Sequence, residues 1–523
     1  MPETCKSVRM IKSINPATLE VNAEIPATPL EDVAGIVDQA RQAQEKWAGV
    51  SLEKRIELLH RAKDYVVSNI DEFIRIITMD NGKTVFESMN AEIMGMLDTI
   101  EFVSKNASKI LGDENLKSTI FTLSGLKSRN VFEPCGVSCI ISPWNFPFAN
   151  VWQEIPMALA AGNAVIHKPA EVTAWVGDLT RRIFEEIGAP PGLVSVLQGS
   201  GSRLGAEILK AGVDNVIFTG SVPVGKRLMA ACAETLTPIT LELGGKDPFI
   251  VLDDADVERA AGGAVWSAYM NAGQICASAE RIYVHEKVAD QFIDLVVKKT
   301  GQLRLGNGLD KETDMGPMIS EDQLNIVDSH VKQAVEKGAR VLKGGKRWHG
   351  LPGYFYEPTV LVDVDHSMDC MIEETFGPTM PIMRISSEDE AVALANDTGF
   401  GLTASVWTRS RQRAERMARR IKTGTVTANN HALTAGFAIC PWGGVKESGV
   451  GRVHSAHGLR AQANIKNVTF HKAMASRDLW WHPYTEEKFK SMKSLLTLQY
   501  DKSSGGRAAH LVTVAKAFMK LLK

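Results

Sequence analysis

The feature that most constrains the fold is an alternation of short apolar runs with longer helical patterns, which begins near residue 131. The run VSCII at 137–141 is typical of a strand buried on both faces, and a helix is expected at 150–161, after Pro147. Parallel strands need crossover helices, so the alternation predicts a doubly wound α/β sheet. The other strands expected in this series are 164–167, 193–197 and 215–218, and the other helices are 173–187, 202–211 and 223–234.

A second series of the same kind follows Gly244 and Gly245, which form a natural hinge between two α/β domains. Its expected strands are 248–252, 281–284 and 340–343, and its expected helices are 256–270, 287–302 and 388–396. Ahead of both series, residues 32–77 and 85–112 carry apolar side chains at helical spacing. Two further stretches, 118–132 and 464–470, have the pattern of exposed strands, which often pair with a partner sheet.

Composition excludes several classes of protein. The 523 residues are 44% hydrophobic and 23% charged, as in globular proteins, and a net charge of −2 gives no general attraction to nucleic acid. The seven cysteines are scattered, and the Cys135/Cys139 pair has no second pair at zinc spacing, so we expect no metal site. Free thiols, a first segment without a signal-like apolar core and the lack of an apolar run of about 18 residues favour a cytoplasmic protein.

Cys276 is the first candidate for chemistry. It ends the run NAGQIC in a glycine-bearing loop where a thiol is accessible, and Glu242 lies 34 residues upstream. A carboxyl group flanked by leucines and glycines is expected to have a raised pKa and to accept protons. The pair suggests covalent catalysis through a thiolate, followed by base-assisted release. Taken alone, a lone cysteine is more often an ordinary buried thiol.

Two strand ends carry residues suited to a dinucleotide, because ligands of doubly wound sheets bind beyond the carboxyl ends of the strands. Lys168 can meet a phosphate or ribose oxygen, and Glu171 can hold the adenosine ribose and repel a 2′-phosphate, which favours NAD over NADP. Gly220 permits close approach, Ser221 can cap helix 223–234, and Gly225 follows at a helix N-terminus that suits a pyrophosphate. The common dinucleotide-binding sequence G-x-G-x-x-G is absent. The alternative interpretation of Lys168 and Glu171 is a solvated ion pair at the end of a strand.

Three further segments are candidates for the site. Asn145 lies in SPWNFP, where prolines and aromatic rings fix its amide, so it can form an oxyanion hole with the Cys276 backbone N–H or simply stabilise a turn. Glu374 and Phe376 in EETFGP can hold a nicotinamide ribose and ring, or form an exposed acidic turn. The segment PWGGVKESG at 441–449 can border a substrate pocket or be only a loop.

In order along the chain, seven motifs resemble those of the NAD(P)-dependent aldehyde dehydrogenase superfamily, over about residues 15–472. The motifs are PWNFP around Asn145, KPAE from Lys168 to Glu171, FTGS ending at Ser221, ELGGK from Glu242, GQIC ending at Cys276, ETFGP from Glu374 and PWGGVK from Pro441. The resemblance implies two doubly wound α/β domains plus a small β oligomerisation domain. We therefore expect an NAD-binding domain at 1–115 and 135–243, a catalytic domain at 244–445, an oligomerisation domain at 116–134 and 460–475, and a C-terminal extension at 476–523.

The resemblance also implies roles for these residues. Cys276 would attack the aldehyde, Asn145 and the Cys276 N–H would hold the oxyanion, hydride would pass to the nicotinamide, and Glu242 would activate water to hydrolyse the thioester. Relatives that transfer the acyl group to coenzyme A generally lack this glutamate, so a free carboxylic acid is the implied product. The residues implied to bind NAD, with NADP the lesser alternative, are Trp144, Lys168, Glu171, Gly220, Ser221, Gly225, Leu243, Glu374 and Phe376. A non-catalytic structural relative would have lost catalytic residues, which are intact here, and a thiol-dependent esterase would show no cofactor-dependent activity.

The substrate and the tail are less constrained. The helix expected at the pocket mouth, 91–100, carries Met94 and Met96 and no arginine, whereas relatives with acidic substrates place arginines there. Methionines adapt to varied apolar shapes, so we expect a medium-chain aliphatic or aromatic aldehyde, with succinate semialdehyde as the alternative.

The C-terminal extension ends in an expected basic helix with Leu511, Ala515, Phe518 and Leu522 on one stripe. We expect this helix to pack on the enzyme's own surface or on a neighbouring subunit of a homodimer or homotetramer. Peripheral binding to a membrane surface is the alternative, because basic amphipathic helices also lie on membranes.

Overall fold

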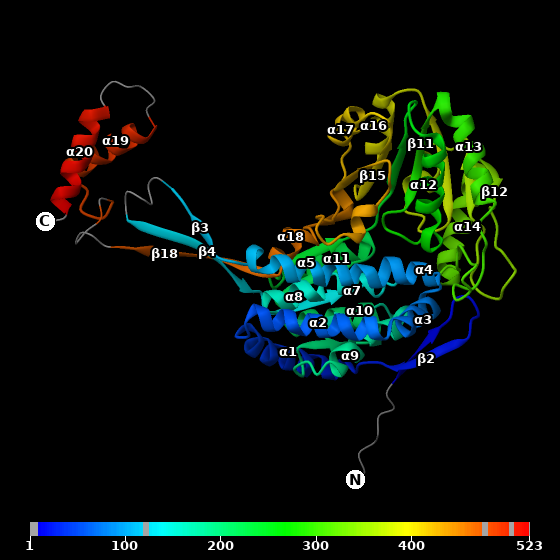
Figure 1. Ribbon diagram of the computed structural model, residues 1–523, viewed down its shortest axis with the longest axis horizontal. Coiled ribbons are helices and arrows are strands. Elements are labelled where there is room, and N and C mark those ends of the chain that lie inside the picture. The colour runs from blue at the N-terminus through cyan, green and yellow to red at the C-terminus, as the bar shows by residue number, and fades with distance from the viewer. Residues whose placement is uncertain (1–8, 119–124, 473–477, 479, 501–506, 522–523) are drawn as a thin grey trace, which may run out of the picture. The chain divides into compact units, whose positions relative to one another are not determined.

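The computed structural model describes residues 9–118, 125–472, 478, 480–500 and 507–521 (Figure 1). The chain forms two compact units, one of Met1–Leu111 and Glu133–Asn464 and the other of Gly112–Phe132 and Ile465–Lys523. Residues 119–124 of the extended stretch expected at 118–132 lie outside the described residues, as do Leu522 and the side chain of Phe518 in the expected terminal stripe.

The first sheet of the larger unit is doubly wound, as predicted. Its six strands lie in the order β17-β9-β8-β5-β6-β7, and β5 to β9 are mutually parallel. From central β5 the chain runs outward to β6 and β7, then returns to the other side of β5 for β8 and β9, so the switch point lies between β5 and β8. The strands are β5 Val137–Ile141, β6 Ala164–Lys168, β7 Val194–Val196, β8 Asn215–Thr219, β9 Ile239–Glu242 and β17 Gly449–Val450.

The second sheet of the larger unit has seven strands in the order β12-β13-β14-β11-β10-β15-β16. All neighbours are parallel except β12, which pairs antiparallel with β13 at the edge and so differs from the expected parallel series. The strands are β10 Asp247–Val251, β11 Ala279–His285, β12 Arg340–Lys343, β13 Thr359–Val362, β14 Thr379–Ile385, β15 Thr403–Trp407 and β16 Thr425–Ala428.

Helices bury both sheets, and two separate apolar cores result, one centred on each sheet. Helices α2, α5 and α8 pack against one another beside the first sheet (Figure 1). The helices that precede the second sheet in the chain, together with α18 after it, are α1 Val33–Ala48, α2 Leu52–Ser68, α3 Ile70–Asn81, α4 Val85–Glu87, α5 Met94–Ile110, α7 Ala149–Trp152, α8 Ile155–Ala161, α9 Ala174–Glu186, α10 Gly201–Lys210, α11 Val222–Ala233 and α18 Ser455–Ala461. The others of the larger unit are α12 Val257–Tyr269, α13 Glu286–Thr300, α14 Glu321–Glu336, α15 Asp369–Ile372, α16 Glu388–Asn396 and α17 Arg411–Ala418.

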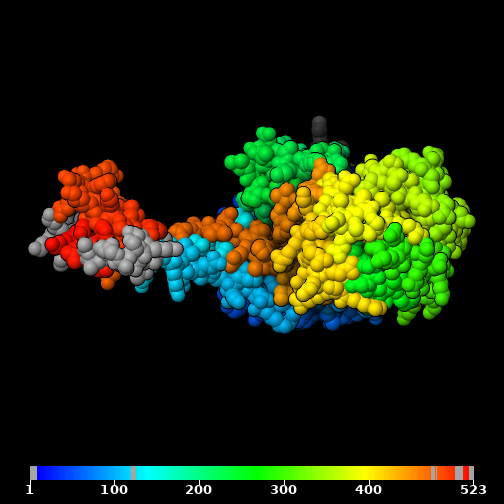
Figure 2. Space-filling view, turned by 90° about the horizontal axis from the view of Figure 1, so that it is seen from above, coloured from blue at the N-terminus to red at the C-terminus, as the bar shows by residue number. Residues whose placement is uncertain are grey.

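The smaller unit combines a sheet with a helical hairpin. The strands β3 Glu114–Leu116, β4 Leu126–Pro134 and β18 Ala463–His471 form a sheet in the order β18-β4-β3. The predicted stretch 464–470 is therefore a strand, and so is 126–132 of the stretch predicted at 118–132. Helices α19 Glu486–Tyr500 and α20 Arg507–Leu521 pack against each other and are drawn in orange and red in Figure 2. None of the helices in the described residues has the length and apolarity needed to span a bilayer.

Three local features differ from the sequence expectations. The helix expected at 150–161 is two helices, α7 and α8, because the Pro156 ring cannot follow a continuous helical turn. Ser221 stands at the N-cap of α11 but its hydroxyl makes no capping bond, since Pro223 in the first turn lacks an N–H. The strands β1 Met10–Ile14 and β2 Val21–Pro26, which form a hairpin, were not expected.

Candidate active site

Four candidate residues meet at one edge of the first sheet. Asn145 follows β5, Lys168 ends β6, Gly220 follows β8 and Glu242 ends β9. Since these strands are parallel, their carboxyl ends lie together, as the sequence interpretation requires. The backbone also joins them, because the Gly220 N–H donates to the Glu242 carbonyl at 3.0 Å.

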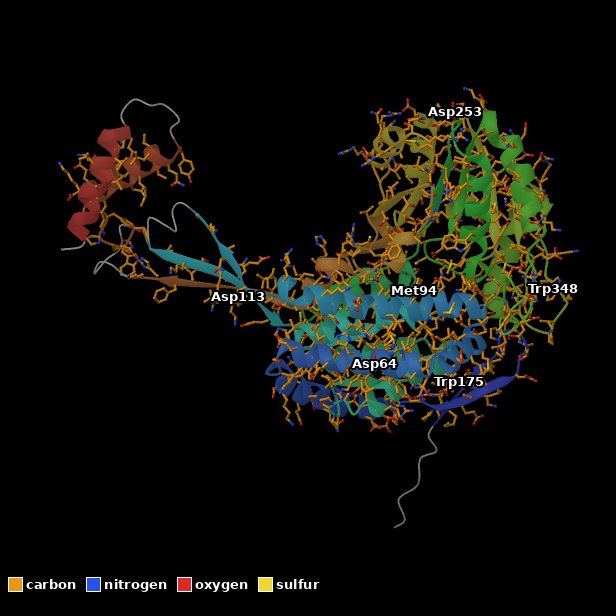
Figure 3. All side chains as sticks on the ribbon, viewed as in Figure 1. Asp64, Met94, Asp113, Trp175, Asp253 and Trp348 are labelled. Atoms are coloured by element: carbon orange, nitrogen blue, oxygen red, sulfur yellow. The ribbon has the colours of Figure 1, made fainter. Side chains whose placement is uncertain are left out.

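A cavity of about 190 Å³ contains both Cys276 and Glu242 on its wall. Most of the wall is apolar, and Met94, marked on α5 in Figure 3, belongs to it, whereas Met96 lies in the core. The described residues of the wall include no lysine and no arginine. The aromatic and larger apolar residues of the wall are Met94, Phe146, Leu243, Trp266, Met270, Ile275, Leu433, Phe437, Trp442 and Val453.

The loop before Cys276 has an unusual backbone. Asn271, Ala272 and Gly273 are consecutive left-handed residues with φ of 50°, 54° and 72°, and all three are buried. A Cβ at Gly273 would lie 2.2 Å from the Gly377 carbonyl oxygen, so only glycine fits. Strain of this kind persists only where neighbours enforce it, and it is common at functional sites.

Buried hydrogen bonds enforce that conformation. The Asn271 N–H donates to the Glu87 carboxylate at 2.7 Å, and the Gln274 side chain accepts from the Ile319 N–H at 2.8 Å while donating to the Asn271 carbonyl at 2.9 Å. The Cys276 thiol is thereby held half-buried at the cavity wall. Within the described residues its backbone N–H has no acceptor.

Asn145 is brought to this loop. Its side-chain amide is buried and donates to the Gln274 carbonyl at 3.1 Å, two residues before Cys276. Its own backbone carbonyl accepts from the Asn271 side chain at 3.0 Å. The amide is therefore rigidly held beside the thiol loop.

The sequence interpretation missed a buried ion pair that supports Asn145. Lys83 and Glu92 have no exposed side-chain surface and pair at 2.5 Å, and the Lys83 ammonium also donates to the Asn145 carbonyl at 2.8 Å. The second carboxylate oxygen of Glu92 accepts from the N–H groups of Phe148 and Ala149 at 3.1 and 2.7 Å. Glu92 points inward from a π-helical turn, Ser88–Ile93, a form that occurs often at functional sites.

Burial raises the pKa of the acidic groups of the site, because desolvation disfavours their charged forms. Glu242 is 5% exposed, and burial, followed by the charge of nearby Glu154, raises its pKa well above the ordinary value. Burial likewise raises the pKa of Glu154 and of Glu374 to about 8. Burial, and then the charges of neighbouring carboxylates, also raises the pKa of the Cys276 thiol. The raised pKa expected for Glu242 is confirmed.

The adenosine-side candidates lie at the end of β6. Lys168 is 3% exposed, burial lowers the pKa of its ammonium to about 8, and the described residues offer it no hydrogen-bonding partner. The Nζ atom would be 3.4 Å from a Cβ at Gly201, the first residue of α10. Glu171 is paired with Arg9, a contact that the sequence interpretation did not anticipate.

The remaining cofactor candidates fall into two groups. Gly225 lies in the first turn of α11, where a Cβ would be 2.6 Å from the Leu243 side chain, so helix and strand end approach closely. Glu374 accepts from the Gly245 N–H at 3.0 Å, and its carboxylate covers Gly244. The Phe376 and Trp144 rings meet edge to face with centroids 5.2 Å apart.

Comparison with known proteins agrees with this geometry. A sequence model of the aldehyde dehydrogenase family matches residues 4–468. The chain is 39% identical to the 3-sulfolactaldehyde dehydrogenase of Pseudomonas putida, over 87% of this chain and 92% of that protein. It is 34% identical to the 4,4'-diapolycopene aldehyde oxidase of a Methylomonas species, over 94% of this chain and 92% of the relative.

A solved structure shares the fold. The betaine aldehyde dehydrogenase of Staphylococcus aureus, in complex with NAD+, superposes with a TM-score of 0.85 at 34% identity, covering 92% of this chain and 95% of that one. The chain belongs to the aldehyde dehydrogenase family, which uses NAD(P), and is an aldehyde dehydrogenase.

Proposed function

We propose that the protein oxidises an aldehyde to the free carboxylic acid with NAD, through a covalent intermediate on Cys276. The observation that carries the proposal is that one cavity holds the Cys276 thiol and the buried Glu242 carboxyl group, with the Asn145 amide at the adjoining loop. A thiol and a carboxyl group on one wall can act on the same acyl group in succession.

Each residue has a distinct task in this proposal. The sulfur of Cys276 bonds to the aldehyde carbon, and the Asn145 amide with the Cys276 N–H stabilises the resulting oxyanion. When bound, NAD supplies the hydride acceptor that converts the thiohemiacetal to a thioester. Glu242 then takes a proton from the water that attacks the thioester, and a base with a raised pKa does this more readily near neutral pH.

The residues fit a dinucleotide at the end of the first sheet. Lys168, buried and without a hydrogen-bonding partner in the described part of the chain, can bind a ribose or phosphate oxygen. Glu171 favours NAD by repelling a 2′-phosphate, although the Arg9 side chain offsets part of that charge. Trp144, Gly220, Ser221, Gly225, Leu243, Glu374 and Phe376 are the other residues that we propose contact the cofactor.

For the substrate we propose a medium-chain aliphatic or aromatic aldehyde. The cavity wall is mostly apolar and its described residues lack a lysine or arginine that could hold the carboxylate of succinate semialdehyde, which disfavours that alternative. The similarity to an enzyme named for a carotenoid aldehyde also supports an apolar substrate. The values of kcat/KM for nonanal, benzaldehyde, succinate semialdehyde and betaine aldehyde test this, and a tenfold preference for either charged aldehyde would contradict it.

The division of labour between thiol and base is tested by rapid mixing. Cys276→Ala should abolish NADH formation, whereas Glu242→Gln should keep a burst of about one NADH per site followed by slow turnover, because only hydrolysis needs the base. Cys440→Ala, which removes a free, half-buried thiol outside the cavity, is the control and should behave as the wild type. Equal loss of the burst in the first two variants would contradict the assignment.

We further propose a cytoplasmic homodimer or homotetramer with the domain division given by the motifs. The sheet of β3, β4 and β18, of which β4 and β18 lie within 116–134 and 460–475, would serve oligomerisation, and α20 would pack on the enzyme or a neighbouring subunit. Light scattering with and without residues 505–523 tests the subunit role. Flotation with lipid vesicles tests the alternative, since flotation only with the tail present would favour a membrane surface.

A further inference from the structure

A second carboxylic acid shares the cavity of Cys276 and Glu242. Glu154, between α7 and α8, is 4% exposed and forms part of the same wall. Its carboxyl group has no ion-pair partner within the described residues, and neither oxygen of Glu242 has a hydrogen-bonding partner there. Two buried carboxyl groups, neither with an ion-pair partner in the described residues, thus line one cavity.

The described residues of the cavity wall include no cation that could neutralise the charge of Glu154 or Glu242. The wall's other titratable residues are Cys276, His431 and His454, and burial lowers the pKa of both histidines to about 4, so they are neutral near pH 7. Arg452 lies near Glu242 and lowers its pKa somewhat, but its guanidinium donates to the backbone carbonyls of residues 444 and 451.

Two carboxyl groups in such a space oppose each other's ionisation. Burial raises the pKa of Glu154 to about 8, and an ionised Glu154 raises the pKa of Glu242 further. Groups coupled in this way lose their protons in two steps that belong to the pair, so near neutral pH the pair holds at least one proton.

We propose that Glu154 is a positioning residue that controls when Glu242 is available as a base, because the two buried carboxyl groups lie in the wall of one cavity whose described residues include no lysine or arginine. This rests on the proposed hydrolysis of a Cys276 thioester. In that step the water oxygen bonds to the acyl carbon while one water proton moves to ionised Glu242. The C–S bond breaks, and its electron pair returns to the Cys276 sulfur. Glu242 then releases this proton to solvent. An ionised Glu154 raises the pKa of Glu242 and so opposes that release.

The test is the pH dependence of deacylation, measured by rapid mixing after the hydride burst. Glu154→Gln keeps the shape but removes the ionisable group, so the acid limb of the deacylation rate should move to lower pH by about one unit or more. Glu154→Asp keeps a carboxyl group and should shift the limb less. Asp80→Asn, which changes an equally buried carboxylate outside the cavity, should keep the wild-type limb.

An unmoved limb in Glu154→Gln would overturn the inference, because a merely structural role predicts a lower rate at every pH without a shift. Infrared titration of the free protein provides a second readout that does not use the reaction. The band of protonated carboxyl groups should lose intensity at neutral pH in Glu154→Gln. If the band that remains, from Glu242, titrates at the same pH in the variant as in the wild type, the coupling is refuted. Absence of a hydride burst in the wild type would instead contradict the proposed function, and the infrared result would still decide the coupling.

Discussion

Removing the Lys83 ammonium isolates the contribution of the ion pair behind Asn145. Lys83→Met leaves the Glu92 carboxylate buried without a counterion, and breaking one side of a buried pair costs about 3–5 kcal/mol. The Asn145 carbonyl also loses one donor, worth about 1 kcal/mol. Glu92 keeps the N–H groups of Phe148 and Ala149, which offset part of the loss, so we expect a net cost of about 3–4 kcal/mol.

Amide hydrogen exchange followed by mass spectrometry measures this cost where it arises. The amide hydrogens of Phe148 and Ala149 point at Glu92, and local opening with a free energy lowered by about 3–4 kcal/mol should speed their exchange by roughly two to three orders of magnitude. A global unfolding curve would be less direct, because a chain with two compact units need not unfold in one step.

A second buried pair supplies the matched control. Lys246 pairs with Glu280 at 2.5 Å, and Glu280 accepts from the N–H groups of Thr375 and Phe376, both at 2.8 Å. Lys246→Met should therefore speed exchange at residues 375 and 376 and leave 148 and 149 as in the wild type. Acceleration of less than tenfold in Lys83→Met, or the same pattern in both variants, would refute the reasoning.

Three other changes have defined outcomes. Gly273→Ala forces a Cβ into a left-handed position against a backbone carbonyl, which costs about 2–5 kcal/mol. The distorted loop should reduce the NADH burst, and a burst equal to that of the wild type would show that the loop tolerates a side chain. Arg9→Ala frees the Glu171 carboxylate and should raise the kcat/KM preference for NAD over NADP by up to roughly fivefold, and an unchanged ratio would contradict a role for this exposed pair. Burial raises the pKa of Asp80 to about 7, so the native state holds its proton more tightly than the unfolded state, and this group's contribution to stability falls as pH rises from about 4 to about 7. The thermal midpoint of Asp80→Asn minus that of the wild type should therefore increase from about pH 4 to about pH 7. A difference that does not change with pH would contradict the linkage.

Three strands of the first sheet, β5, β6 and β8, could be predicted closely because strands buried on both faces are continuous apolar runs, whereas β9 and β17 were not predicted. β5 matches its predicted bounds, and β6 and β8 match within one residue. The β1–β2 hairpin could not be predicted, because its strands are short and largely exposed and leave no continuous apolar run. Helix α16 was predicted at its observed bounds, since its acidic first turn and apolar spacing agree.

The site divides in the same physical way. Loops and strand ends carry Cys276, Glu242 and Asn145. At such positions, neighbouring glycine and proline residues and the place at the end of a strand indicate a candidate site residue in the sequence. Lys83 and Glu154 stand inside or beside helical patterns, where a charged residue normally indicates a solvated face. Their burial depends on which helices pack together, and no local spacing encodes that.

The chemistry of the cavity follows from the opposite effects of burial on acids and on histidines. Desolvation disfavours the charged form, so it lowers the pKa of His431 and His454 to about 4 while raising that of Glu154 to about 8. The carboxylates of this cavity are therefore stronger bases than its imidazoles, the reverse of their order in water. His431 is also occupied by Ser405 and the Ala277 carbonyl. We therefore expect proton transfer at Cys276 to depend on the two glutamates, and the weak basicity of the two cavity histidines is no argument against a reactive thiol.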